Sequence, residues 1–245
     1  MTQAVAIPPK RAVRKAKVKT LVVNFVLDET GSMLGCADAT ISGFNEYIGE
    51  LAKRPEPICF TLTKFNSSRI DIVHAGVPIG EVVRLSHGNY QPDNLTPLYD
   101  AVARTIKATE AALVSIPNHA VLCAIMTDGE ENASHEYTRN DIFALIKSKQ
   151  DEGWTFAFLG ADQDAWDAGA KMGIPGGNTM SYAGTPTGTK SAMGNLAAST
   201  VCYAASGGVQ TDSFFDKTPV MASVTVPPIK RTVHKAKRKP KLRNW

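Results

Sequence analysis

The chain has 245 residues, of which 43% are hydrophobic and 20% charged, and its formal net charge is +4. This length is sufficient for one domain with a sizeable core, plus tails. No stretch approaches the roughly 18–20 apolar residues of a membrane span, and the first ten residues lack the apolar run of a secretory signal. We therefore expect a cytoplasmic protein without membrane contact.

The charges are distributed very unevenly along the chain. Residues 1–20 contain six Lys and Arg residues and residues 229–245 contain eight, and neither segment contains an acidic residue. The region between them carries 13 basic and all 23 acidic residues, a formal charge of −10. We predict a basic N-terminal arm at 1–19, an α/β domain at 20–206, and a linker with a basic C-terminal arm at 207–245.

The two arms share a linear motif, Lys-Arg-x-Val-x-Lys-Ala-Lys, at residues 10–17 and 230–237. Such a duplication favours two copies of one docking sequence, for nucleic acid, for an acidic protein surface or for a neighbouring copy in a homo-oligomer. Lys and Arg neutralise phosphates and so bind nucleic acids. Two solubilising tails are the simpler alternative. The candidate contact residues are Lys10, Arg11, Arg14, Lys15, Lys17, Lys230, Arg231, Lys235, Lys237 and Arg238.

Cysteine and histidine give no sign of catalysis or of a soft metal site. The four cysteines are far apart in the sequence and form no Cys-x-x-Cys motif, so we predict reduced thiols. The five histidines show no ligand spacing, and no Ser has an evident His partner. We therefore expect a protein that is not an enzyme.

The first half of the domain begins with an apolar run at 20–27 that predicts a buried strand. A helix is predicted at 38–52, because apolar residues recur there at intervals of three and four. The segments 59–65 and 69–73 flank a short polar turn, which requires an antiparallel hairpin at the edge of a sheet. Residues 75–95 are rich in Gly, Pro and Asn and are predicted to be mostly loop.

The second half continues the alternation of helices and strands. Helices are predicted at 97–115, 138–151, 162–172 and 185–205, and strands at 119–127, 154–159 and 179–182. This order predicts an α/β fold with a doubly wound, mainly parallel central sheet, one antiparallel edge strand, and helices on both faces.

Three polar motifs follow or precede these elements at chemically informative places. The sequence Asp-Glu-Thr-Gly-Ser-Met at 28–33 follows the first strand and offers Asp28, Thr30 and Ser32. Carboxylate and hydroxyl oxygens suit Mg²⁺, which keeps several waters and needs few charged ligands. Gly31 gives the backbone the freedom for these side chains to converge.

The second and third motifs lie farther along the chain. Thr96 directly precedes Pro97, a favoured first residue of a helix, and Asp128 directly follows the strand at 119–127. Ligands of open α/β sheets bind at the carboxyl ends of the strands, so the motifs can form one composite site. The alternative is that Asp28 and Asp128 merely cap helices.

Together the three motifs resemble the metal-ion-dependent adhesion site of the von Willebrand factor A family, of bacterial or phage type, whose pattern is Asp-x-Ser-x-Ser, then Thr, then Asp. The resemblance covers roughly residues 20–206 and implies a Rossmann-like fold. It implies direct ligation of the metal by Asp28, Ser32 and Thr96, with Thr30 and Asp128 acting through water or as supports. Thr30 replaces the usual Ser but keeps the hydroxyl. The implied ion is Mg²⁺, with Mn²⁺ and Ca²⁺ as alternatives.

The resemblance implies an adhesion module whose bound cation accepts an Asp or Glu side chain from a partner protein. Two alternatives stay open. The arms could make the chain a nucleic-acid-associated or virion assembly protein, or the chain could be a non-catalytic partner of an AAA+ ATPase.

One further motif, at residues 184–191, resembles a phosphate-binding P-loop. Thr189 stands where that loop requires a glycine before Lys190, which disfavours nucleotide hydrolysis.

Overall fold

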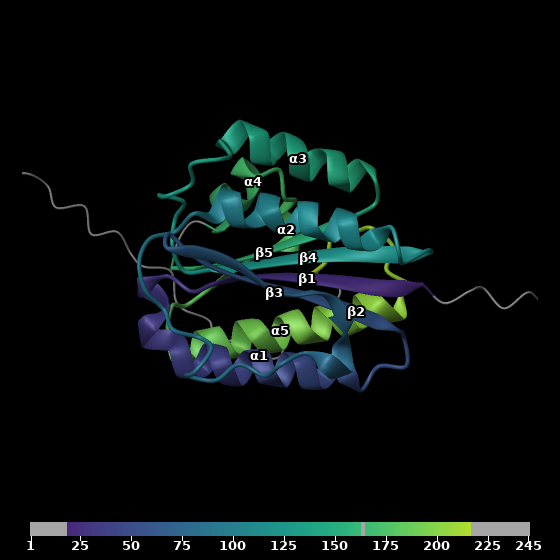
Figure 1. Ribbon diagram of the computed structural model, residues 1–245, viewed down its shortest axis with the longest axis horizontal. Helices are drawn as coiled ribbons and strands as arrows, with labels where there is room; N and C mark the ends of the chain where they lie inside the picture. Colours follow the sequence, from purple (N-terminus) through teal and green to yellow (C-terminus); the bar gives the residue numbers. More distant parts are fainter. Residues whose placement is uncertain (1–18, 163–164, 217–245) are drawn as a thin grey trace, which may run out of the picture.

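The computed structural model describes residues 19–162 and 165–216, which form one six-stranded sheet between two layers of helices (Figure 1). Its strand order is β3-β2-β1-β4-β5-β6, and neighbours are parallel except for the antiparallel pair β2 and β3. The strands are β1 (Thr20–Asp28), β2 (Ile58–Asn66), β3 (Arg69–Pro78), β4 (His119–Thr127), β5 (Thr155–Ala161) and β6 (Thr179–Tyr182). The predicted fold class is confirmed.

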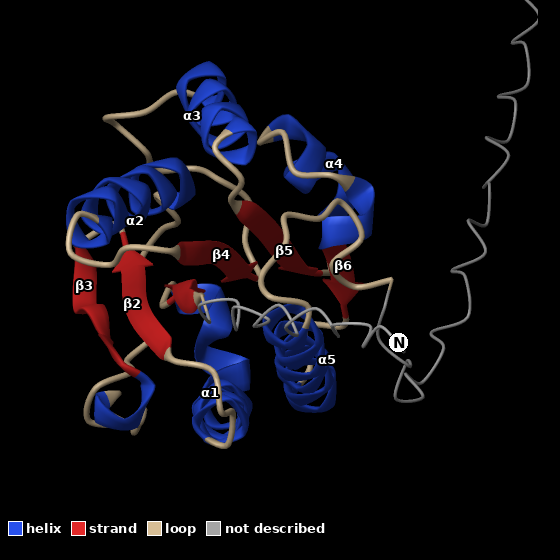
Figure 2. Ribbon diagram, turned by 90° about the vertical axis from the view of Figure 1, so that its right-hand side faces the viewer, coloured by secondary structure: helices blue, strands red, loops and turns tan. Residues whose placement is uncertain are grey.

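The helices are divided between the two faces of the sheet, as Figures 1 and 2 show: α2, α3 and α4 cover one face, and α1 and α5 lie side by side on the other. Their bounds are α1 (Ala37–Ala52), α2 (Leu98–Leu113), α3 (Arg139–Asp151), α4 (Ala165–Lys171) and α5 (Pro186–Ala205). Three short 3₁₀ helices complete the described elements: η1 (Gly31–Cys36), η2 (Ile79–Glu81) and η3 (Gly176–Asn178).

The position of β1 in the centre of the sheet explains why its sequence is almost continuously apolar. Phe25 and Leu27 belong to the core under α1 and α5, whereas Val22 and Val26 belong to the core under α2. A central strand covered by helices on both faces must bury both sets of alternating side chains. This burial holds the carboxyl end of β1, with Asp28, in a fixed position.

Three element boundaries differ from the sequence-based expectations. Strand β3 continues to Pro78, so part of the segment expected to be loop pairs with β2. Pro97 precedes α2 as its N-cap rather than serving as its first residue. Helix α4 is shorter than the helix predicted at 162–172.

Residues 207–216 pack against the domain, beyond the boundary predicted at residue 206. Phe214 is 3% exposed within the core on the α1 and α5 side, and its backbone N–H donates to Asn178 Oδ1 at 2.8 Å. Thr211 N donates to Thr155 Oγ1 at the first residue of β5. This segment and Thr20 therefore both lie at the amino-terminal edge of the sheet.

The arm residues predicted to contact nucleic acid or protein lie outside the described residues. Within 19–162 and 165–216, no helix has both the length and the apolar character needed to cross a bilayer.

Candidate metal centre

The candidate site lies at the carboxyl edge of the sheet, between β1 and β4. These neighbouring strands mark the point where the strand order reverses, because β2 and β3 follow on one side of them and β5 and β6 on the other. Loops diverge at such a point and leave a crevice that is the usual ligand site of open α/β sheets. Asp28 ends β1, and Asp128 directly follows β4.

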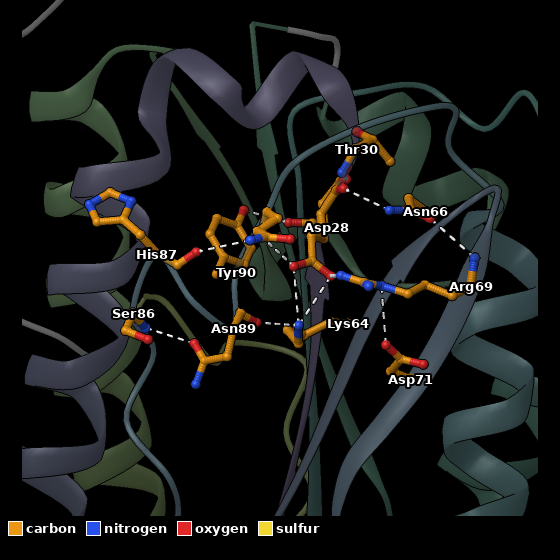
Figure 3. Close-up of polar contacts among 12 residues, drawn as sticks. Asp28, Thr30, Lys64, Asn66, Arg69, Asp71, Ser86, His87, Asn89 and Tyr90 are labelled. Carbon is orange, nitrogen blue, oxygen red and sulfur yellow. Dashed lines mark hydrogen bonds and ion pairs between the residues drawn. The ribbon is translucent and has the colours of Figure 1, made fainter.

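Asp28 is held from several sides. Its side chain is 0% exposed, Oδ1 accepts the N–H of Thr30 at 2.7 Å, and Oδ2 accepts the hydroxyl of Thr127 at 2.5 Å. Its backbone oxygen accepts the hydroxyl of Tyr90 at 2.7 Å (Figure 3). The carboxylate is therefore fixed and still has unused lone pairs.

Hydroxyl groups connect Asp28's loop to Asp128. Thr30 Oγ1 lies 3.1 Å from Ser32 Oγ, and Ser32 Oγ donates to Asp128 Oδ1 at 2.5 Å. Thr30 is buried, whereas Ser32 is exposed and Asp128 is partly so. The outer side of this chain of oxygens is thus accessible to solvent.

Thr96 approaches the same place from the loop before α2. A Cβ built on Gly129 would lie 3.0 Å from Thr96 Oγ1 and 3.7 Å from Ser32 Oγ, so both hydroxyls border the space beside Gly129. Asn132 holds the backbone of Thr96 in place. The Thr96 N–H donates to Asn132 Oδ1 at 2.9 Å, and the Thr96 carbonyl accepts the Asn132 N–H at 3.1 Å. The fold thus brings all five predicted ligands together.

Neither Asp28 nor Asp128 caps a helix, so that alternative interpretation is wrong. The residue before η1 is Thr30 and the residue before α1 is Cys36, and neither helix start receives a side-chain cap. Helix α3 is capped by Thr138 in a capping box with Asp141.

The electrostatics of the site favour a cation. Burial raises the pKa of Asp28 to about 6, although hydrogen bonds from Thr127 and Thr30 oppose the rise, and the charge of Asp128 adds to it. Burial also raises the pKa of Asp128. Among the described residues, no ion pair includes either carboxylate, because the nearby Lys64 and Arg69 bind Glu29 instead. A buried charge such as that of Asp28, with no cationic partner among the described residues, is unfavourable.

The donor set fits a hard divalent cation. In the described part of the chain, no group of three or more His, Cys, Asp and Glu side chains is placed to hold a metal ion. A cation at this site would therefore take two carboxylates, neutral hydroxyls and water, which is a set that Mg²⁺ accepts.

Several residues that shape the site were missed by sequence reasoning. Thr127 and Tyr90 bind Asp28, as described above, and Glu131 organises the loop after β4. Glu131 Oε2 accepts the N–H of Tyr99, at the start of α2, and the hydroxyl of Ser134, in the loop after β4. Glu131 thus joins this loop to the start of α2. Only the position of Thr127 directly before Asp128 offered a signal.

The segment that resembles a P-loop does not form one. Thr185 caps α5, Thr189 and Lys190 lie within that helix, and Lys190 pairs with Glu46 of α1 at 3.0 Å. The lysine is therefore exposed on the surface of the α1 and α5 layer and is paired with a carboxylate.

Comparisons with solved structures agree with the fold. The structure of proximal thread matrix protein 1 from the mussel byssus matches with a TM-score of 0.53 and 12% identity over 74% of this chain and 46% of that chain. The crystal structure of the SpRpn10 VWA domain matches with a TM-score of 0.51 and 8% identity over 74% of this chain and 95% of that chain. The chain thus spans about half the length of the first of these proteins.

No protein-family model and no curated protein matches the sequence itself. At these identities the structural similarity concerns the fold alone, and it establishes a Rossmann-like von Willebrand factor A architecture for this chain.

Proposed function

We propose that the chain is a metal-dependent protein-binding module without catalytic activity. In this proposal Mg²⁺ binds between Asp28, Thr30, Ser32, Thr96 and Asp128, and Mn²⁺ or Ca²⁺ are the alternative ions. The observation that carries it is Asp28: a wholly buried carboxylate that is fixed by two hydrogen bonds, has no cationic partner among the described residues, and lies beside further oxygen donors.

The residues of the chain have distinct roles in this mechanism. Asp28 and Asp128 supply the negative charge, while Thr30, Ser32 and Thr96 supply neutral oxygens. When bound, the cation provides a positive charge that an Asp or Glu carboxylate of a partner protein can neutralise. Because Asp28 would be the only carboxylate in direct contact with the ion and Asp128 would act through water, the cation would keep positive charge at the water-filled positions that a partner's carboxylate can take.

A pull-down with the tagged full-length protein tests this function. Lysate treated with nuclease is divided between buffer with Mg²⁺ and buffer with EDTA, and retained proteins are identified by mass spectrometry. We expect a partner that is retained only with Mg²⁺ and is lost with the Asp28→Ala variant. Full retention of the same partner by that variant would contradict the proposal.

A second candidate function rests on the segregation of charge between the arms and the domain. The arms carry 14 of the 27 basic residues and no acidic residue. We propose nucleic-acid binding through the arms as the alternative, in a nucleoprotein or virion assembly. Its affinity should fall steeply with salt, with a log–log slope of about −0.9 per phosphate contacted on B-DNA, and it should be indifferent to EDTA.

A further inference from the structure

A second charged cluster lies directly behind the candidate metal centre. Glu29 follows Asp28, yet its side chain is directed to β2 and β3 and is 0% exposed. Lys64 Nζ of β2 lies 3.1 and 3.2 Å from its two carboxylate oxygens, and Arg69 Nη2 of β3 lies 3.1 Å from Oε2 (Figure 3). Lys64 is itself almost completely buried. The cluster is therefore a buried ion pair reinforced by a half-exposed arginine.

This ion pair also binds the loop that leads to Thr96. Lys64 Nζ donates to the backbone oxygen of Asn89 at 2.5 Å, and the N–H of Gln91 donates to Glu29 Oε1 at 2.6 Å. Between these two residues lies Tyr90, whose hydroxyl donates to the backbone oxygen of Asp28. One pair of charges thus holds the loop against the residue that ends β1.

Backbone hydrogen bonds extend the same connection towards Thr96. The N–H of Asp93 donates to the carbonyl of Glu29 at 3.0 Å, and the N–H of Gly31 donates to the carbonyl of Asn94 at 3.0 Å. Asn94 has a positive φ of 65°, which turns the chain just before Thr96. The segments that carry Asp28 and Thr96 are therefore joined by contacts on both sides of Glu29.

We propose that Glu29 and Lys64 are a positioning pair for the metal centre: together they set the relative position of Asp28 and Thr96, and thereby the affinity for Mg²⁺. This inference rests on the proposed function. A buried ion pair contributes little net stability compared with neutral groups of similar size. Residues that orient metal ligands, in contrast, typically affect metal affinity by 10- to 100-fold.

The test uses the full-length Glu29→Gln/Lys64→Met double variant, which removes both charges and leaves neither unpaired. Mg²⁺ affinity is measured by titration calorimetry at low temperature, where unfolded chain is not populated, and the unfolding temperature is measured without metal. We expect nearly the same unfolding temperature as the wild type and at least a tenfold higher Kd for Mg²⁺. The exposed pair Glu50 and Lys53 provides the matched control, since Glu50→Gln/Lys53→Met should change neither quantity.

A second variant keeps the inference falsifiable if the double variant folds poorly. Tyr90→Phe removes only the hydroxyl that binds the Asp28 carbonyl and keeps the ring in the core. We expect a several-fold higher Kd for Mg²⁺ with an intact fold. The same affinity as the wild type in both variants, or in Tyr90→Phe alone if the double variant is unfolded, would overturn the inference. Failure of the wild type to bind Mg²⁺ would instead overturn the proposed function, and the inference with it.

Discussion

Asp28 is the residue at which stability and the proposed function oppose each other. Its carboxylate is buried, its pKa is raised to about 6, and the hydroxyl and amide hydrogen bonds around it do not neutralise its charge. One unit of pKa corresponds to about 1.4 kcal/mol. The metal-free protein at pH 7 therefore holds an unfavourable charge that a bound cation would compensate.

The first prediction concerns Asp28→Asn. The variant keeps the shape of the side chain, and Thr127 can accept from the new amide because its hydroxyl also lies 3.0 Å from the Gly129 carbonyl. Without metal, we expect the variant's free energy of unfolding to equal that of the wild type or to exceed it by up to about 3 kcal/mol. We also expect the variant to lose the rise in unfolding temperature that Mg²⁺ causes in the wild type. Thermal denaturation with EDTA and with Mg²⁺ measures both.

The exposed carboxylate of Asp38 provides the control for this experiment, since Asp38→Asn should respond to Mg²⁺ as the wild type does. An undiminished Mg²⁺ response of the Asp28→Asn variant would exclude Asp28 as a ligand.

Gly129→Ala tests the space between the hydroxyls. The added methyl group would lie 3.0 Å from Thr96 Oγ1, which is closer than an ordinary van der Waals contact, and would enter the space that Thr96 and Ser32 border. We expect a folded protein with about tenfold weaker Mg²⁺ binding, which is the lower end of the effects of mutating residues that orient metal ligands. Gly80→Ala, where no atom lies within 4 Å, should bind Mg²⁺ normally. Equal affinities of the two variants would place the ion elsewhere.

At the residue scale, the sequence was sufficient to identify the groups that meet at the carboxyl edge, because residue type and strand ends are local properties. It was insufficient for Tyr90 and Lys64, which reach Asp28 and Glu29 from 62 and 35 residues away. Such contacts depend on the pairing of β1 with β2 and on the path of the loop after β3, and no local pattern encodes either.

At the scale of elements, periodicity predicted the helices and strands where one side of an element meets the core. Periodicity failed where the pairing of a strand with its neighbour determines how far the strand extends. The last part of β3 is paired with β2 although Gly76 and Pro78 are poor strand residues, and Gly76 adopts a positive φ of 67° with its N–H donating to Thr61 Oγ1. A register shift between these strands accommodates the irregularity.

The packing of α1 on α5 gives a prediction at this scale. A Cβ on Gly43 would lie 2.8 and 2.9 Å from Met193 Cγ and Cβ, so the two helices approach closely at this glycine. Gly43→Ala should lower the free energy of unfolding by about 1–2 kcal/mol, because overpacking outweighs the gain in helix propensity. Chemical denaturation measures the change.

Gly49 lies on the same helix and provides the comparison. Only the Arg84 guanidinium comes near its added methyl group, at 3.8 Å. Gly49→Ala should therefore stabilise the protein by about 0.5–1 kcal/mol. Destabilisation of both variants by the same amount would show that α1 does not depend on the close approach at Gly43.

At the scale of the whole molecule, the charges divide the chain into parts that can be tested separately. Residues 19–216 contain 13 basic and all 23 acidic residues, a formal charge of −10. Removal of residues 1–18 and 217–245 should leave the stabilisation by Mg²⁺ unchanged, since none of the proposed ligands lies in the removed segments. The same truncation should abolish any salt-sensitive retention on nucleic acid, because the remaining domain repels phosphates.

Calorimetric Mg²⁺ titration and filter binding at two salt concentrations measure the two effects independently. A truncated protein that lost its response to Mg²⁺ would place a metal ligand in an arm, and one that retained salt-sensitive nucleic-acid binding would exclude the arms as the contact.

The first and last described segments of the chain lie far from the candidate metal centre. Thr20 opens β1, and Phe215 N–H donates to the carbonyl of Gly177 just before β6, so both ends meet the sheet at its amino-terminal edge. Asp28 lies at the opposite edge, nine residues along β1, which is about 25–30 Å at roughly 3.3 Å per residue. A partner protein whose carboxylate bound at the proposed metal centre would therefore approach the domain from the edge opposite to Thr20 and Phe215.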